Sequence, residues 1–136
     1  RYRWLRLLPG ARWPAGPAGR DLLRRLNNVG RACQSQITIT SGRRGPKAQW
    51  RAFQDYLRGG TLAAPCCAKH WPHSWEDCGR QCASQHCASR AADCTMRGAN
   101  IGEIPCARRE MRSHGLCLPV GYGETWHVEV GTTWRS

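Results

Sequence analysis

The chain has 136 residues, which is enough for one domain with a modest core. Its 21 Lys and Arg residues against 9 Asp and Glu give a formal net charge of +12, which favours a polyanionic partner: nucleic acid, an acidic membrane or an anionic cell wall. No apolar run is long enough to span a bilayer, so we expect no membrane insertion.

The first part of the chain is basic and runs into a stretch rich in Pro and Gly, residues 9–19. This composition is typical of an extended segment, so we predict a linker or N-terminal extension over residues 1–20 and a folded domain over residues 21–136. The chain begins with Arg, and its first ten residues lack the apolar core of a signal peptide. We therefore expect a fragment of a longer protein, without a secretion signal in this part.

Hydrophobic periodicity predicts the regular elements that follow. Leu22, Leu23 and Leu26 recur at helical spacing, with Gly30 as a plausible stop, whereas the alternation around Ile37 has the period of a half-buried strand. The same criteria predict further helices over residues 47–58 and 104–115 and further strands over residues 89–96, 116–120 and 126–130. Together these elements predict an α+β domain with a small antiparallel sheet and flanking helices.

Nine cysteines are present, an odd number, so at least one is free, bound to a metal or paired with another chain. We interpret residues 66–82, where periodicity is lost, as a Cys-rich loop insertion stapled by disulfides, because the spacings form no regular pair of C-x2-C motifs. The alternative is a second, structural zinc. The candidate ligands, or disulfide partners, are Cys66, Cys67, Cys78 and Cys82.

The most informative histidine lies in the stretch GETWHVEV near the C-terminus. His127 needs partners to bind a metal, and the stretch SQHCASRAAD supplies His86 and Asp93, seven positions apart. Two imidazoles and a carboxylate are donors that zinc accepts, and a catalytic zinc keeps a fourth position open for a water whose pKa falls to about 7. Glu124 is a candidate general base. Glu129 shares a strand face with His127 and is placed to hold its second ring nitrogen.

Three motifs follow one another along the chain: first SGRR after a predicted strand, then SxHxxxxAxD, and last ExWH. They resemble a family of zinc peptidases, the D,D-carboxypeptidases and L-alanyl-D-glutamate endopeptidases, which share a fold with the Hedgehog signalling domain. The resemblance covers about residues 21–131. It implies a zinc peptidase domain of Hedgehog-like fold, one catalytic zinc bound by His86, Asp93 and His127, and Glu124 as general base and acid.

The resemblance also implies roles for residues around the metal. Arg44 stands at the arginine position of the family's S-G-Y-R turn and would stabilise the oxyanion, although Arg43 beside it could exchange roles with it. Ser84 and Trp126 would line the substrate cleft; their ordinary structural roles are those of a turn residue and a core aromatic. The sequence departs from the family at Ser89, where glycine is common, and in the Cys-rich insertion.

The family acts on bacterial peptidoglycan, so the resemblance implies hydrolysis of a bond in the stem peptide or cross-link. We expect an L-Ala-D-Glu endopeptidase first, with a D-Ala-D-Ala carboxypeptidase or dipeptidase as the alternative. The positive charge favours an anionic wall, and the missing signal peptide favours a phage endolysin, made in the bacterial host cytoplasm and acting on the cell wall. We expect a monomer.

A binding protein is the competing class. In this interpretation a zinc-stabilised module without catalysis would use its basic residues to bind nucleic acid or the wall. Such a module would not need a glutamate, Glu124, three residues before His127, so we do not expect nucleic acid as the partner. A domain that keeps the fold and the metal but only recognises a ligand is a third interpretation, and the intact Glu124 argues against it.

Overall fold

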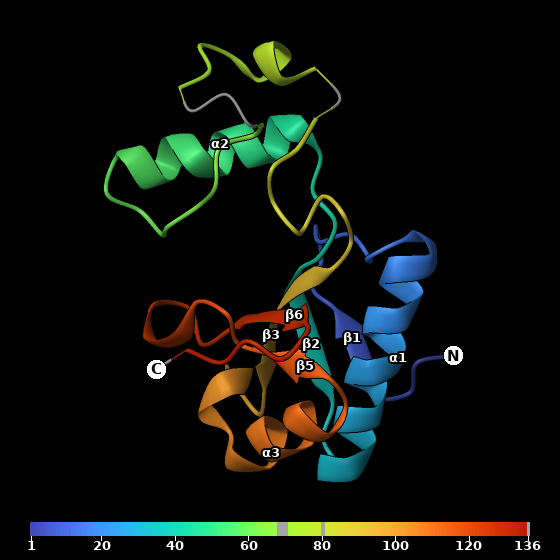
Figure 1. The fold of residues 1–136 in the computed structure, drawn as a ribbon. Coiled ribbons are helices and arrows are strands. Elements are labelled where there is room, and N and C mark those ends of the chain that lie inside the picture. Colours follow the sequence, from blue (N-terminus) through green and yellow to red (C-terminus); the bar gives the residue numbers. More distant parts are fainter. Residues whose placement is uncertain (68–70, 80, 136) are drawn as a thin grey trace.

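The computed structural model describes residues 1–67, 71–79 and 81–135 and has two parts (Figure 1). The larger part is a sheet with α1 (Gly16–Cys33) and α3 (Pro105–Ser113) packed against it. At the other end of the molecule, α2 (Pro46–Leu57) packs against a short 3-10 helix, Trp75–Cys78, of the Cys-rich segment. In the described part of the chain, no helix has the length and hydropathy needed to cross a membrane.

The sheet has the strand order β1-β2-β3-β6-β5, with β4 on β3. The strands are β1 (Leu5–Leu7), β2 (Ile37–Ser41), β3 (Ala91–Met96), β4 (Ala99–Asn100), β5 (Leu116–Cys117) and β6 (His127–Val130). All pairs are antiparallel except β1 and β2, which run parallel. The α+β class is confirmed, but the sheet is mixed and the expectation of a purely antiparallel sheet is wrong.

The predicted linker contributes to this sheet. Leu5 is buried and pairs with Ile37, and the backbone N–H of Trp4 donates a 2.9 Å hydrogen bond to Oδ1 of Asn27 on α1. The Pro- and Gly-rich stretch includes the first turn of α1, where Pro17 stands at a position that has no helical N–H bond to lose. The prediction of a linker is therefore wrong for β1 and for the start of α1.

α1 forms the main core with the sheet. Leu22, Leu26 and Val29 are fully buried on its inner face, as the helical spacing predicts. Gly30 does not end the helix, which continues to Cys33. A Cβ at Gly30 would lie 2.6 Å from Cβ of Trp4, so glycine is required there because the chain entering β1 passes directly over the helix.

Candidate metal centre and its cleft

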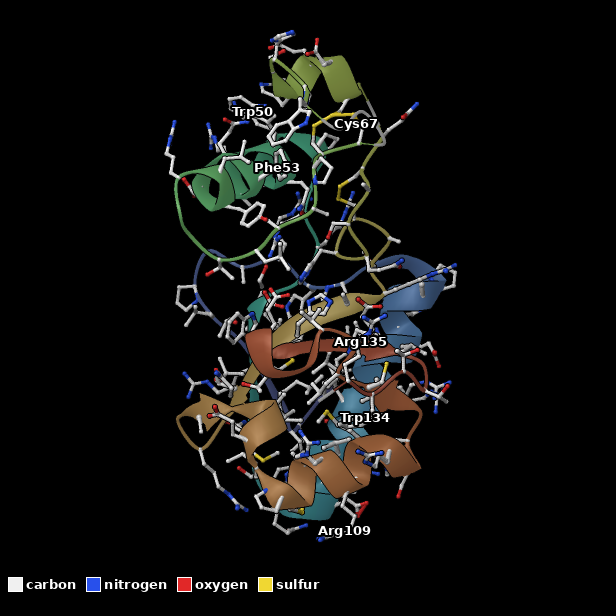
Figure 2. All side chains as sticks on the ribbon, turned by 60° about the vertical axis from the view of Figure 1, so that its left-hand side comes forward. Trp50, Phe53, Cys67, Arg109, Trp134 and Arg135 are labelled. Atoms are coloured by element: carbon white, nitrogen blue, oxygen red, sulfur yellow. A yellow bond between two sulfur atoms is a disulfide. The ribbon has the colours of Figure 1, made fainter. Side chains whose placement is uncertain are left out.

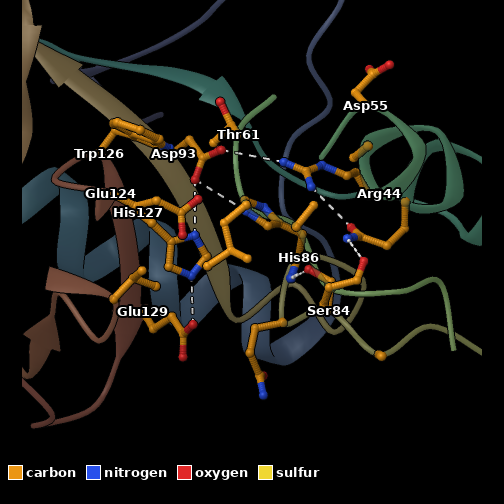
Figure 3. A pocket seen from close by; sticks show the side chains of 18 residues that line it. Arg44, Asp55, Thr61, Ser84, His86, Asp93, Glu124, Trp126, His127 and Glu129 are labelled. Carbon is orange, nitrogen blue, oxygen red and sulfur yellow. Dashed lines mark hydrogen bonds and ion pairs between the residues drawn. The ribbon is translucent and has the colours of Figure 1, made fainter. Parts of the chain in front are cut away.

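Two neighbouring strands and one turn bring the predicted ligands together (Figure 3). Asp93 on β3 stands directly opposite His127 on β6 in the antiparallel register. His86 lies in the turn that precedes β3, and its side chain is 4% exposed. Side-chain exposures of 13% for Asp93 and 12% for His127 show that the cluster is largely buried but still reached by solvent.

One carboxylate oxygen lies at the centre of the cluster. Oδ1 of Asp93 is 3.3 Å from Nε2 of His86 and 3.1 Å from Nδ1 of His127. One donor atom from each of the three residues lies within 4.8 Å of the others. This is the His-Asp-His set that the sequence predicts, gathered at a distance that one metal ion can bridge.

The hydrogen bonds of His86 test whether the cluster fits a cation. Nδ1 of His86 lies 2.9 Å from the carbonyl oxygen of Gly42, which can only accept, so Nδ1 carries the proton. In the neutral ring, Nε2 then directs a lone pair at Oδ1 of Asp93. Two lone pairs that face each other repel unless a proton or a cation lies between them. The donor set therefore fits a bound metal ion.

The charges around His127 also favour a cation. Its second ring nitrogen, Nε2, lies 2.7 Å from Oε2 of Glu129, as strand alternation predicts. Burial lowers the pKa of His127, but the hydrogen bonds to Asp93 and Glu129 outweigh it and raise the pKa to about 9. Burial raises the pKa of Asp93, but the hydrogen bond from His127 and the closeness of the His86 ring outweigh it and hold the pKa at about 2. Two carboxylates thus surround a site that stabilises positive charge.

Glu124 lies beside this cluster, on the same side of β6 as His127 (Figure 3). It follows the short 3-10 helix Gly121–Gly123, and its backbone carbonyl accepts a 3.1 Å hydrogen bond from the N–H of His127. Burial raises the pKa of the Glu124 carboxyl, although the nearby charge of His127 opposes the shift. A carboxyl with a raised pKa can exchange protons closer to neutral pH than an exposed one.

Arg44 reaches the cluster from the loop after β2. Its Nη2 donates to Oγ of Ser41 at 2.9 Å and lies 3.5 Å from Oδ2 of Asp93, while its Nη1 donates to Oε1 of Gln49 at 3.1 Å. Arg43 is exposed and its backbone N–H bonds to the carbonyl of Arg12. Of the two adjacent arginines, the structure places Arg44 in the cleft.

Gln49 also lines the cleft, although the motifs of the sequence do not point to it. It lies on α2, is 1% exposed, and its Nε2 donates a 2.8 Å hydrogen bond to the carbonyl of Ala64. The side chain thereby links Arg44 to the segment that follows α2. The available signal was its position four residues before Phe53, which puts a polar side chain on the buried face of the helix.

A cleft of about 690 Å³ opens over the cluster. α2 and residues 61–64 line one wall, and β3, β6 and residues 83–86 line the other. Ser84 and Trp126 both line the cleft. Ser84 also accepts a 3.2 Å hydrogen bond from the backbone N–H of His86, which is the turn role that its residue type suggests. The volume lies in the range of sites that bury small ligands, about 300–1,000 Å³.

The cysteines separate into pairs, a cluster and single thiols. Cys33 is bonded to Cys106, which ties α1 to α3, and Cys82 is bonded to Cys87. The disulfide interpretation thus accounts for Cys82. The remaining cysteines of the insertion, Cys66, Cys67 and Cys78, gather at one point, while Cys94 and Cys117 are free and buried.

Comparisons with known proteins assign no family. No protein-family model matches the chain, and a search of the curated proteins returns no match. The resemblance to the zinc peptidases therefore depends on the three sequence motifs. The structure adds that the motif residues His86, Asp93, Glu124 and His127 lie together, with Arg44 at the edge of the same cleft.

Proposed function

We propose that the chain is a zinc-dependent peptidase that hydrolyses a peptide bond in bacterial peptidoglycan. The observation that carries this proposal is the convergence of His86, Asp93 and His127 in a cleft that also holds a half-buried glutamate and an arginine. A metal site that only stabilised the fold would have its coordination closed by protein ligands. Three donors open to a cleft, beside an acid-base group, are the arrangement of a catalytic site.

The three donors fit zinc by their chemistry. Nε2 of His86, a carboxylate oxygen of Asp93 and Nδ1 of His127 would hold the ion, and Glu129 would accept the remaining N–H of His127. Bound there, zinc would act as a Lewis acid and lower the pKa of water. The Gly42 carbonyl fixes His86 in the tautomer that this ligation needs.

Glu124 would manage the protons of the reaction. It accepts a proton as the water oxygen attacks the peptide carbonyl carbon, and it returns that proton to the nitrogen as the C–N bond breaks and the amine leaves. Its partly buried carboxyl suits both steps, because burial raises its pKa towards neutrality. A group of this kind contributes about 10²–10⁴ in rate.

Arg44 would stabilise the negative charge that develops on the carbonyl oxygen. Ser41 and Gln49 hold its guanidinium from two sides, so the group is already oriented before substrate binds. A fixed charge of this kind contributes more than a mobile one, because it need not reorganise during the reaction. Arg43 lies outside the cleft walls and takes no part in this step.

The proposed substrate class follows from the resemblance and the charge. The net charge of +12 favours an anionic wall polymer, and the cleft can accept a peptide segment. We favour the L-Ala-D-Glu bond of the stem, with a D-Ala-D-Ala carboxypeptidase as the alternative within the same family. The biological setting that we propose is a monomeric phage endolysin domain, made in the host cytoplasm and acting on the wall.

A synthetic stem pentapeptide contains each candidate bond and tests the proposal. Incubation with the zinc-loaded protein should give fragments whose masses identify the bond. Glu124→Gln keeps the shape of the side chain but cannot take up the proton, so we expect turnover to fall by about 10² or more at unchanged zinc content. Glu103→Gln, at an exposed glutamate outside the cleft, is the matched control. A metal-replete, fully active Glu124→Gln protein would disprove the assignment.

A further inference from the structure

A second group of metal donors lies outside the cleft, between α2 and the Cys-rich segment (Figure 2). The Sγ atoms of Cys66, Cys67 and Cys78 lie within 4.8 Å of one another, and the three residues are 0%, 3% and 4% exposed. Trp50 of α2 packs against them. The cluster is therefore enclosed by side chains.

Disulfide bonding alone does not account for this cluster. Cys78 is in bonding contact with both Cys66 and Cys67, yet a sulfur forms only one disulfide. The Cα separations from Cys78 are 6.1 and 5.2 Å, and both lie within the range of about 4.4–6.8 Å that disulfides adopt. The backbone thus gives neither partner an advantage, and either bond would leave a third thiol buried beside it.

We propose that Cys66, Cys67 and Cys78 supply three of the four ligands of a structural zinc ion. Thiolates at about 2.3 Å in a tetrahedral zinc site lie about 3.8 Å apart, which the observed grouping allows without rearranging the backbone. Thiolate sulfur selects zinc over hard ions such as Mg²⁺ and Ca²⁺. Binding releases the thiol protons and satisfies all three sulfurs at once, which a disulfide cannot do.

The segment has a small apolar core. Its buried cluster consists, among the described residues, of these three cysteines with Trp50 packed against them. A segment with so small a core depends on cross-links or a metal for its structure. Nε1 of Trp50 is buried without a hydrogen-bond partner among the described residues, and a metal-bound thiolate would offer it an acceptor.

The zinc would also stabilise one wall of the cleft. The carbonyl of Cys66 accepts a 3.2 Å hydrogen bond from the N–H of Ala83, and Ala83 and Ser84 line the cleft. Loss of the ion should therefore loosen the wall at Ala83 and Ser84, whereas His86 keeps its own 2.9 Å hydrogen bond to the carbonyl of Gly42. For a peptidase of the class proposed above, this predicts a raised KM with a smaller change in kcat. This kinetic statement, and the count of a second zinc at His86, depend on the proposed function.

Metal analysis tests the inference independently of activity. We expect two zinc ions per chain in the wild type, one in Cys78→Ser and one in His86→Ala. Cys117→Ser, at a buried thiol outside the cluster, should keep both and is the matched control. Cobalt substitution distinguishes the two sites, because only the cysteine cluster can give a sulfur-to-cobalt charge-transfer band. That band should persist in His86→Ala and disappear in Cys78→Ser.

Alkylation under denaturing, non-reducing conditions with a chelator distinguishes zinc-bound thiols from a disulfide. The proposal predicts modification of Cys66, Cys67 and Cys78 alike. A peptide in which Cys78 is cross-linked to Cys66 or Cys67, together with a zinc content unchanged by Cys78→Ser, would overturn it. If Cys78→Ser fails to fold, Cys67→His serves instead, because residue 67 then keeps a zinc donor but can no longer form a disulfide with Cys78. Retained zinc in a folded Cys67→His protein supports the proposal, and loss of that zinc opposes it.

Discussion

Glu129 offers a direct test of how the proposed metal centre is built. Its Oε2 lies 2.7 Å from Nε2 of His127, and its side chain is 24% exposed, so solvent screens the pair only in part. Removing a carboxylate that holds a metal-binding histidine costs about 10–100-fold in metal affinity, or about 1.4–2.7 kcal/mol. Glu129→Gln keeps an acceptor oxygen but removes the charge, so we expect the zinc Kd to rise about tenfold; Glu129→Ala should approach the upper limit.

Competition with a chromophoric chelator measures these zinc affinities at constant pH and salt. Glu103→Gln removes the same charge from an exposed position and is the matched control, because it reports the effect of net charge alone. The reasoning predicts weakened binding in both Glu129 variants and wild-type binding in the control. Equal zinc affinity in all four proteins would refute it.

Three further predictions follow from other contacts. Gln49→Leu removes one of the hydrogen bonds that orient the Arg44 guanidinium, so kcat should fall about tenfold at unchanged zinc content. In Arg44→Lys, kcat should fall further, by about 10²-fold. Steady-state kinetics that match the wild type would contradict both predictions. The Cys33–Cys106 disulfide closes a sequence separation of 73, so replacing both cysteines with Ser should lower the free energy of unfolding by about 4 kcal/mol in urea titrations, and a loss below about 1 kcal/mol would contradict the loop-closure argument. In the metal-free protein, the pKa of His127 is about 9, above its ordinary value of about 6.5, so the folded state binds this proton more tightly than the unfolded state does. Protonated His127 therefore stabilises the fold fully below about pH 6.5, and this stabilisation is lost as the pH rises through about 9. Thermal unfolding of chelator-treated protein should show stability falling across that interval, and a constant or rising Tm would contradict the assignment.

The sequence predicts those helices and strands in which apolar residues recur at a regular spacing. α1 and β2 follow from buried leucines and isoleucines at regular spacing, and the predicted helices at α2 and α3 and strands at β3, β5 and β6 are also confirmed. The sequence does not predict β1, because a strand of three residues is too short to show a hydrophobic period. Its pairing with β2 is a long-range contact that no local pattern specifies.

The candidate site was predicted by residue type and order, and its assembly depends on strand register. Asp93 and His127 come together because β3 and β6 pair with these residues opposite each other, and spacing along the chain does not determine that register. Gln49 was missed because a buried glutamine on an amphipathic helix looks like a surface residue. The grouping of Cys66, Cys67 and Cys78 likewise depends on how the Cys-rich insertion folds onto α2. The insertion has no repeating pattern from which that fold could be predicted.

Digestion of purified peptidoglycan tests the central claim most directly. Wild-type protein loaded with zinc, the same protein stripped of metal, and zinc-loaded Glu124→Ala are incubated with walls of several chemotypes, and the released fragments are analysed by mass spectrometry. We predict new stem-peptide termini from the zinc-loaded wild type alone, at one bond. No fragments from any wall, with the protein folded and its zinc bound, would contradict the account.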